Sequence, residues 1–262
     1  MKNNLINLTN LPKISIKINT LWLLQHSMLD NMNASDIIIR YMFIEHYYGK
    51  PNNGLELYST MQRTRVKNNK HVPKYRDDNG KRFVQLIKSF EKKGYDSNYP
   101  IQLNKYFVVF DGCHRLALAL YHNIEEVDVC FNEPVDFVPN YSLNWFDEVN
   151  LSEYKEIIRK KYQDILISKS KRYFLIIPKS KNIDLDKLKE TFHIEVINDI
   201  DLYTKNKISN KDFNIVLLID VAPEYDVKYI KSKKVIKNLN EEKVINFVRK
   251  NDLKFINEDK NV

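Results

Sequence analysis

The strongest constraint on the fold of this 262-residue chain is an apolar run that stops at Asp-Gly and is followed at once by an apolar helical pattern. Residues 107–110 are β-branched and aromatic, which favours a strand. Gly112 permits a tight turn, and residues 116–120, all Leu or Ala, favour a helix. The sequence therefore predicts a strand, a turn and a helix in direct succession, with the start of the helix anchored by its apolar residues.

This corner has the properties of an anion site. The N–H groups of a first helical turn have no partner within the helix, and the helix dipole favours negative charge there. His114 and Arg115 stand beside these N–H groups, and Asp111 places a carboxylate at the rim. A capped turn with a solvated Arg115 is the alternative, but the adjacent His-Arg pair favours a functional site. We expect a phosphate ester, rather than an apolar ligand, to bind at this corner.

The pattern of elements predicts an α/β protein with two domains. Residues 1–150 are expected to form a catalytic or nucleotide-binding domain, residues 151–169 a charged linking helix, and residues 170–262 a smaller α/β domain in which strands and helices alternate. Residues 71–80 are expected to form a loop, and residues 132–150 to wrap around the first domain. The expected strands are residues 14–18, 100–103, 106–110, 127–131, 173–178, 194–197, 213–219 and 235–236, and the expected helices are residues 35–48, 55–66, 80–93, 113–121, 184–192 and 241–250.

The net charge of +8 does not by itself indicate nucleic-acid binding. Residues 151–262 hold 24 basic and 18 acidic residues, whereas residues 1–150 hold 18 and 16. In the C-terminal part the two signs are interleaved along expected helices, as in residues 153–161, which is typical of a solvated helix face. The half that carries the Asp-Gly corner is close to neutral.

Cysteine content and hydropathy bear on the compartment. Two cysteines, Cys113 and Cys130, argue against a disulfide scaffold and for a reducing environment. No apolar run reaches the roughly 20 residues that a membrane span needs, and the first residues lack a signal-peptide pattern. We therefore expect a cytoplasmic protein without a membrane partner.

Residues 82–131 resemble the core of the ParB/sulfiredoxin-like superfamily. The matching pieces are a helix ending at residues 88–95, a Pro-Ile strand, a Val-Val-Phe strand, the Asp-Gly-Cys-His-Arg turn opening a helix, and a closing strand. The resemblance covers about 50 residues. It implies a nucleotide-binding core in which the phosphates are held by Gly112, Cys113, His114 and Arg115.

Among the branches of this superfamily, the chain is most similar to small-molecule kinases such as the free-serine kinases, because Asp111 directly precedes the glycine. The resemblance implies ATP, or else ADP or CTP, with Mg²⁺ held by Asp111, and catalytic roles for Asp111 and His114. The acceptor would be a small hydroxylated metabolite, and similar proteins are associated with surface-glycan or secondary metabolism. These kinases also use an upstream glutamate, for which Glu45 and Glu56 are the nearest candidates.

Two other branches remain as alternatives. Chromosome-partition proteins imply a nucleotide-regulated DNA-binding protein, but they carry a more basic loop and a helix-turn-helix, whereas residues 173–219 favour strands. Sulfiredoxins share the four residues from Gly112 to Arg115 and use the cysteine as an attacking thiolate, which would make Cys113 the nucleophile of an ATP-dependent reductase. Asp111 before the glycine and the length of the chain both differ from that branch.

Further cationic and metal-binding candidates lie upstream of the corner. Arg63 and Arg65 would bring two guanidiniums to the phosphate if their helix packs there, and they would otherwise form an exposed basic face. His46 and His71 lack the spacing of a zinc site. No Gly-x-x-x-x-Gly-Lys-Ser/Thr segment is present, so the pattern of a P-loop kinase is absent from the sequence.

Overall fold

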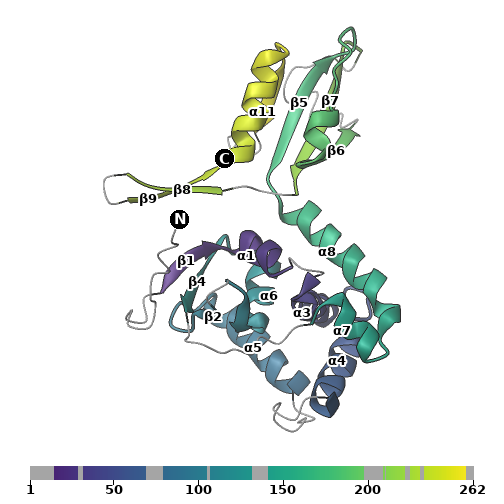
Figure 1. Ribbon diagram of the computed structural model, residues 1–262, viewed down its shortest axis with the longest axis vertical. Helices are drawn as coiled ribbons and strands as arrows, with labels where there is room; N and C mark the ends of the chain where they lie inside the picture. Colours follow the sequence, from purple (N-terminus) through teal and green to yellow (C-terminus); the bar gives the residue numbers. More distant parts are fainter. Residues whose placement is uncertain are drawn as a thin grey trace, which may run out of the picture. The chain divides into compact units, whose positions relative to one another are not determined.

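The computed structural model describes residues 15–28, 32–68, 79–104, 107–131, 141–197, 209, 211–221, 225–230 and 233–257. The chain divides into two compact units, Met1–Asp164 and Ile165–Val262. The division lies inside the predicted linking helix, which in the structure is α8, Lys155–Lys169. Both units are mixed α/β, as expected (Figure 1).

The first unit is built from one small sheet and a set of helices. Across the described part of the chain, no helix combines the length and apolar character that crossing a bilayer requires. The elements before α8 are β1 (Ile16–Asn19), α1 (Thr20–Ser27), α3 (Ser35–Tyr47), α4 (Gly54–Asn68), α5 (Asn79–Lys93), β2 (Ile101–Leu103), β3 (Val109–Asp111), α6 (Cys113–Tyr121), β4 (Glu126–Phe131), α7 (Leu143–Glu148) and the short 3₁₀ helix η2 (Ser152–Tyr154).

The sheet of this unit has the strand order β1-β4-β2-β3. Strand β1 lies at the edge and pairs antiparallel with β4, and it falls within the strand predicted at residues 14–18. Strand β2 pairs parallel with β4 and antiparallel with β3, and Gln102 lies opposite Asp111 in that register. The strands predicted at residues 100–103 and 106–110 thus correspond to β2 and β3.

Helix α6 is the central helix of the unit. Its residues 116–120 are all buried, and the helix contacts α1, α3, α5 and β2 (Figure 1). Burial of five consecutive Leu and Ala residues means that the helix has no solvent-facing side over this stretch. Its first turn, at Cys113, is therefore held in one position.

The turn between β3 and α6 consists of one residue, Gly112, in the left-handed region at φ +101°. A Cβ at this position would lie 3.2 Å from the Cα of Ile101 and 3.2 Å from the guanidinium of Arg115. Two features therefore favour glycine at position 112, namely its left-handed backbone conformation and the close approach of β2.

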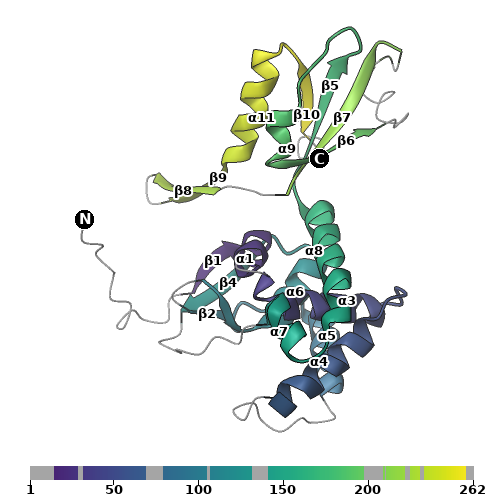
Figure 2. The same cartoon turned by 45° about the vertical axis from the view of Figure 1, so that its right-hand side comes forward.

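The second unit holds a four-stranded antiparallel sheet of order β10-β5-β7-β6 and a separate two-stranded sheet. Helices α9 and α11 cover one face of the larger sheet, where Leu188 and Val244 pack on Tyr173 and Leu218 (Figure 2). The elements are β5 (Arg172–Pro178), α9 (Asp186–Lys189), β6 (Phe192–Ile197), β7 (Phe213–Asp220), β8 (Tyr225–Ile230), β9 (Lys233–Asn238), α11 (Leu239–Lys250) and β10 (Lys254–Asn257).

Several elements differ from the sequence-based expectation, among them α1 and α9. Helix α1 is absent from the predicted elements, although Asn19 caps it by accepting a hydrogen bond from the Trp22 N–H at 2.9 Å. Helix α9 covers four residues instead of the nine predicted, because Phe192 is buried in β6 and draws the chain into the sheet. The predicted loop lies outside the described residues except for its last two, which begin α5, and the first nine residues of the predicted wrapping segment lie outside them too.

Alanine substitutions at Gly112 and at Gly49 distinguish the energetic cost of backbone strain from that of steric contact. Gly49 has φ +82°, and no atom lies within 4 Å of the place that its Cβ would take. Gly49→Ala is expected to lower the free energy of unfolding by about 1–2 kcal/mol, the cost of the left-handed conformation. Gly112→Ala should cost roughly 1–3 kcal/mol more, since β2 must also move. Urea denaturation measures both, and equal losses would show that the contact with Ile101 is unimportant.

Candidate functional site

The site is organised around the first turn of α6. Leu116 makes the first bond of the helix, donating its N–H to the Gly112 carbonyl at 2.9 Å. The N–H groups of Cys113, His114 and Arg115 precede that bond, so the helix itself offers them no acceptor. They form the electropositive end of a nine-residue helix.

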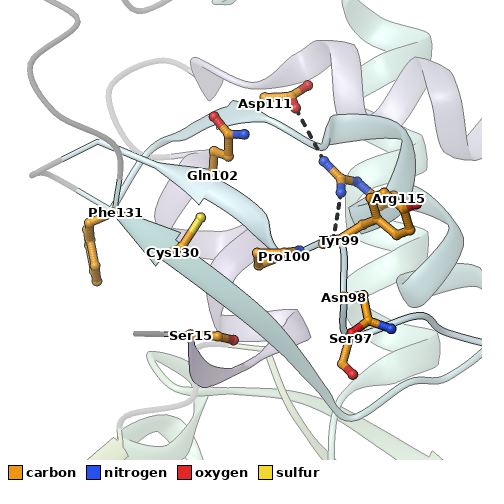
Figure 3. A pocket seen from close by; sticks show the side chains of 10 residues that line it. All are labelled: Ser15, Ser97, Asn98, Tyr99, Pro100, Gln102, Asp111, Arg115, Cys130 and Phe131. Atoms are coloured by element: carbon orange, nitrogen blue, oxygen red, sulfur yellow. Dashed lines mark hydrogen bonds and ion pairs between the residues drawn. The ribbon is translucent and has the colours of Figure 1, made fainter. Parts of the chain in front are cut away.

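Arg115 ties this turn to the loop before β2. Its Nη1 donates to the Tyr99 carbonyl at 2.6 Å, and its Nη2 donates to the Asp111 carboxylate at 3.3 Å (Figure 3). The Asp111 side chain is 61% exposed and that of Arg115 is 22% exposed. Asp111 therefore stays available to a ligand, while Arg115 is already engaged with two partners.

A cavity of about 530 Å³ opens beside Asp111 and Arg115 (Figure 3). Alternation along β2 places Gln102 on the opposite face from the fully buried Ile101 and Leu103, so Gln102 and its register partner Asp111 line the cavity. The remaining wall is both polar and apolar, with side chains from Ser15, Ser97, Asn98, Tyr99, Pro100, Cys130 and Phe131.

A buried ion pair in α3 lies near the same turn. Arg40 is 3% exposed, and its Nη1 donates to the Asp36 carboxylate and, at 2.8 Å, to the Asp36 carbonyl. Its Nε is buried without a hydrogen-bond partner. The charges of Asp36 and Arg40 both act on Cys113, which places the pair next to the N-terminus of α6.

Arg65 of α4 joins this group, and Arg63 does not. The Arg65 guanidinium lies 4.6 Å from the centre of the Tyr141 ring, and its Nε is buried without a partner. Tyr141 is in turn held at the start of α3 by donating its N–H to the Asn33 carbonyl at 2.9 Å. Two residues correspond to about 200° around a helix, and Arg63 accordingly faces away and is exposed.

His114 is enclosed by aromatic side chains and surrounded by arginines. Its Nε2 lies 2.9 Å from the Tyr58 hydroxyl, and its ring centre lies 4.5 Å from that of Phe83. Burial holds its pKa well below the ordinary value of 6.5, and the arginines at positions 40, 65, 115 and 82 lower it further. His114 is therefore a neutral imidazole near pH 7 and supplies hydrogen bonds rather than positive charge.

Cys113 is a thiol rather than a thiolate. Burial raises its pKa to about 12, and Asp36 acts in the same direction, outweighing the opposite effect of Arg40 and Arg65. Some of its surface remains exposed, but the surrounding protein disfavours the charged form. The nearby cations and the helix terminus do not activate this sulfur.

The glutamates considered as candidates do not lie at the turn. Glu45 is nine residues beyond Asp36 on α3, about 13 Å along the helix axis, and bonds to Lys161 at 2.9 Å and to Lys50 at 3.3 Å. Glu56 is exposed on α4 beside Tyr154. Among the described residues upstream of the corner, Asp36 is the buried carboxylate whose charge acts on Cys113.

A metal at this site would depend on Asp111. Within the described residues, no three His, Cys, Asp or Glu side chains are grouped as a metal site requires, His46 is exposed, and His71 lies outside those residues. Mg²⁺ commonly takes only one or two protein carboxylates and completes its shell with water and substrate phosphates. The exposed carboxylate of Asp111 fits that limited role.

Four residues of the site are not evident as such from the sequence, namely Asp36, Arg40, Tyr58 and Tyr141. The first two carry a signal, since an Asp and an Arg four residues apart in the otherwise apolar start of α3 indicate a buried pair. Comparisons of the chain with protein-family models, with curated proteins and with solved structures found no match.

The lowered pKa of His114 makes stability depend on pH. The unfolded chain takes up a proton at this residue as the pH falls through about 6.5, whereas the folded chain does not, so the free energy of unfolding should fall by up to about 1.4 kcal/mol per pH unit. Urea denaturation between pH 7.5 and 5.5 measures the slope. His114→Gln, which keeps a hydrogen-bonding group for Tyr58, should reduce the slope, and an unchanged slope would contradict a neutral His114.

The raised pKa of Cys113 predicts slow alkylation. At pH 8 a pKa of about 12 leaves a thiolate fraction roughly 10³-fold below that of the unfolded chain, so iodoacetamide should modify Cys113 about 10³-fold more slowly in the folded protein. Mass spectrometry of peptides, with and without urea, locates the label. An alkylation rate close to that of the unfolded chain would instead show that Cys113 is a reactive thiolate in the folded protein.

Proposed function

We propose that the chain is a nucleotide-dependent phosphotransferase acting on a small hydroxylated metabolite, built on a ParB/sulfiredoxin-like core. The observation that carries the proposal is the position of Asp111, an accessible carboxylate between the N-terminus of α6 and a cavity of about 530 Å³. The succession β2, β3, one-residue turn, α6 and β4 supports the proposed core, since the resemblance requires these elements in this order.

The phosphates of the nucleotide would bind at the first turn of α6. Its N–H groups and dipole favour a phosphate, and Gly112 allows the one-residue turn that fixes the start of this helix. Arg115 borders this position. ATP is the proposed donor, with ADP or CTP as alternatives.

The cavity beside Asp111 would hold the acceptor. Its volume lies within the range of small-molecule sites, and the amides of Gln102 and Asn98 offer hydrogen bonds to hydroxyl groups. The Asp111 carboxylate would accept the proton of the attacking hydroxyl or hold Mg²⁺ against the phosphates. When bound, Mg²⁺ would supply positive charge that offsets the charge of the transferring group. His114, being neutral, would act by hydrogen bonding.

The alternatives receive less support from the described residues. A sulfiredoxin-like reaction needs a thiolate, and the environment of Cys113 favours the thiol. The described part of the second unit is a sheet with packed helices, in which no helix-turn-helix is formed. We propose a cytoplasmic location, because nucleotide donors and reduced cysteines occur together there.

Asp111→Asn tests the proposal directly. The amide preserves the turn but has neither the charge for Mg²⁺ nor the basicity for a hydroxyl proton, so turnover should fall by ~10²-fold or more while nucleotide binding largely persists. Thermal shift with ATP, ADP and CTP in the presence of Mg²⁺ selects the nucleotide. Phosphorus NMR then follows transfer to a panel of free hydroxy amino acids and sugars.

The matched control is Asp164→Asn, the same chemical change at an exposed position of α8. It should retain turnover and nucleotide binding. Near-normal turnover of Asp111→Asn would make this carboxylate structural and remove the main support for a kinase. Salt-dependent DNA binding without any phosphate transfer would favour the DNA-binding alternative.

A further inference from the structure

Two buried guanidiniums near the first turn of α6 have incomplete hydrogen bonding. The Nε atoms of Arg40 and Arg65 are both buried and without a partner. Arg40 is itself 3% exposed, and its remaining bonds go to Asp36. Buried donors in folded proteins nearly always have an acceptor, so both Nε atoms can take an acceptor supplied by a bound ligand or by water.

The charge at this place is also unbalanced. Asp36 neutralises Arg40, but no carboxylate among the described residues pairs with Arg65. The other neighbours, the thiol Cys113, the imidazole His114 and the two tyrosines, contribute no negative charge. The dipole of α6 adds further positive potential. Within the described part of the chain, one positive charge and the helix terminus therefore have no counter-charge.

We propose that Arg40, Arg65 and the first-turn N–H groups of α6 form an inner anion site that binds a phosphate group. The proposal deepens the proposed function, on which it rests for the choice of phosphate among anions. It shifts the main phosphate contact from Arg115, which already bonds to Asp111 and Tyr99, to Arg65. Arg65, Cys113 and His114 keep partial exposure, which gives an anion access to the site.

The outer side of the turn is less suitable for the same anion. There the Asp111 carboxylate lies beside Arg115 and would repel a phosphate that approached without a metal. On the inner side Asp36 is already bound to Arg40. The guanidinium group of Arg65 is oriented by its stacking on the Tyr141 ring. The two sides of one turn thus have opposite preferences, an anion inside and a hydroxyl or a metal outside.

Inorganic phosphate tests the inner anion site without any need for turnover. Calorimetry should show that Arg65→Gln weakens phosphate binding at least about 10-fold, the effect of losing a charged hydrogen bond. Arg63→Gln is the control, since it removes the same charge from the exposed side of the same helix and should leave affinity within about 2-fold.

A second measurement uses the unsubstituted protein, so the proposal does not depend on a folded variant. Titration with phosphate should shift the amide proton signals of Cys113 and His114 more than those of the second unit. Absence of such shifts, or equal weakening in Arg63→Gln and Arg65→Gln, would overturn the inner anion site. Phosphate binding with no transfer to any acceptor would instead contradict the proposed function alone.

The source of the phosphate group is distinguished by comparing ATP with glucose 6-phosphate. If the nucleotide supplies the group, Arg65→Gln should weaken ATP binding about 10-fold and leave the sugar phosphate unaffected. If the acceptor supplies it, the sugar phosphate should bind, glucose should not, and the variant should weaken that binding. Either result supports the inner anion site, and insensitivity of both ligands to Arg65→Gln would contradict it.

Discussion

The close approach of Gly112 to Ile101 is the constraint on which the site depends. A Cβ at position 112 would lie only 3.2 Å from the Ile101 Cα. Because Gly112 has no Cβ, β3 can pass directly into α6 close to β2. The apolar stretch of α6 then holds the helix among α1, α3 and α5. A one-residue turn leaves little room for adjustment, so Asp111 and Cys113 are fixed on either side of it. This arrangement positions a carboxylate and a helix terminus within three residues of each other.

Around this turn, the charged side chains form two separate groups. Arg115 binds Asp111 on the side of the cavity, whereas Arg40 and Arg65 lie on the side of α3 and α4. Burial and the neighbouring arginines keep His114 neutral, so it does not add to the positive charge. A neutral imidazole bound to Tyr58 is well suited to hold the first turn in place without competing for an anion. The positive potential therefore comes from groups whose charge does not change near pH 7.

The sequence predicts the local features of the site but not the long-range ones. Strand β3, the glycine turn and helix α6 follow from neighbouring residues, and β1 lies within the strand expected at residues 14–18. Arg65 is a candidate on equal terms with Arg63 in the sequence, and only the packing of α4 distinguishes them. Asp36 and Tyr141 reach the turn through tertiary contacts between segments about 30–75 residues away in the chain, a distance that local propensity does not encode. Helix α9 is shorter than its pattern predicts because Phe192 is buried as part of strand β6. This packing is likewise a tertiary effect.

The ion pair of Asp36 and Arg40 is informative because stability alone does not explain it. Well-packed apolar residues often replace a buried pair without loss of stability, since desolvation opposes the attraction of the charges. In α3 the neighbouring residues from Ile37 to Ile39 are fully buried and apolar, so apolar side chains at positions 36 and 40 would also suit this part of the helix. An apolar pair would not supply a positive charge near Cys113, nor the unpartnered Nε–H donor of Arg40. Asp36 stabilises Arg40 as a charged group in the interior and leaves its Nε for another acceptor. The pair is therefore better explained by the proposed inner anion site than by a contribution to stability.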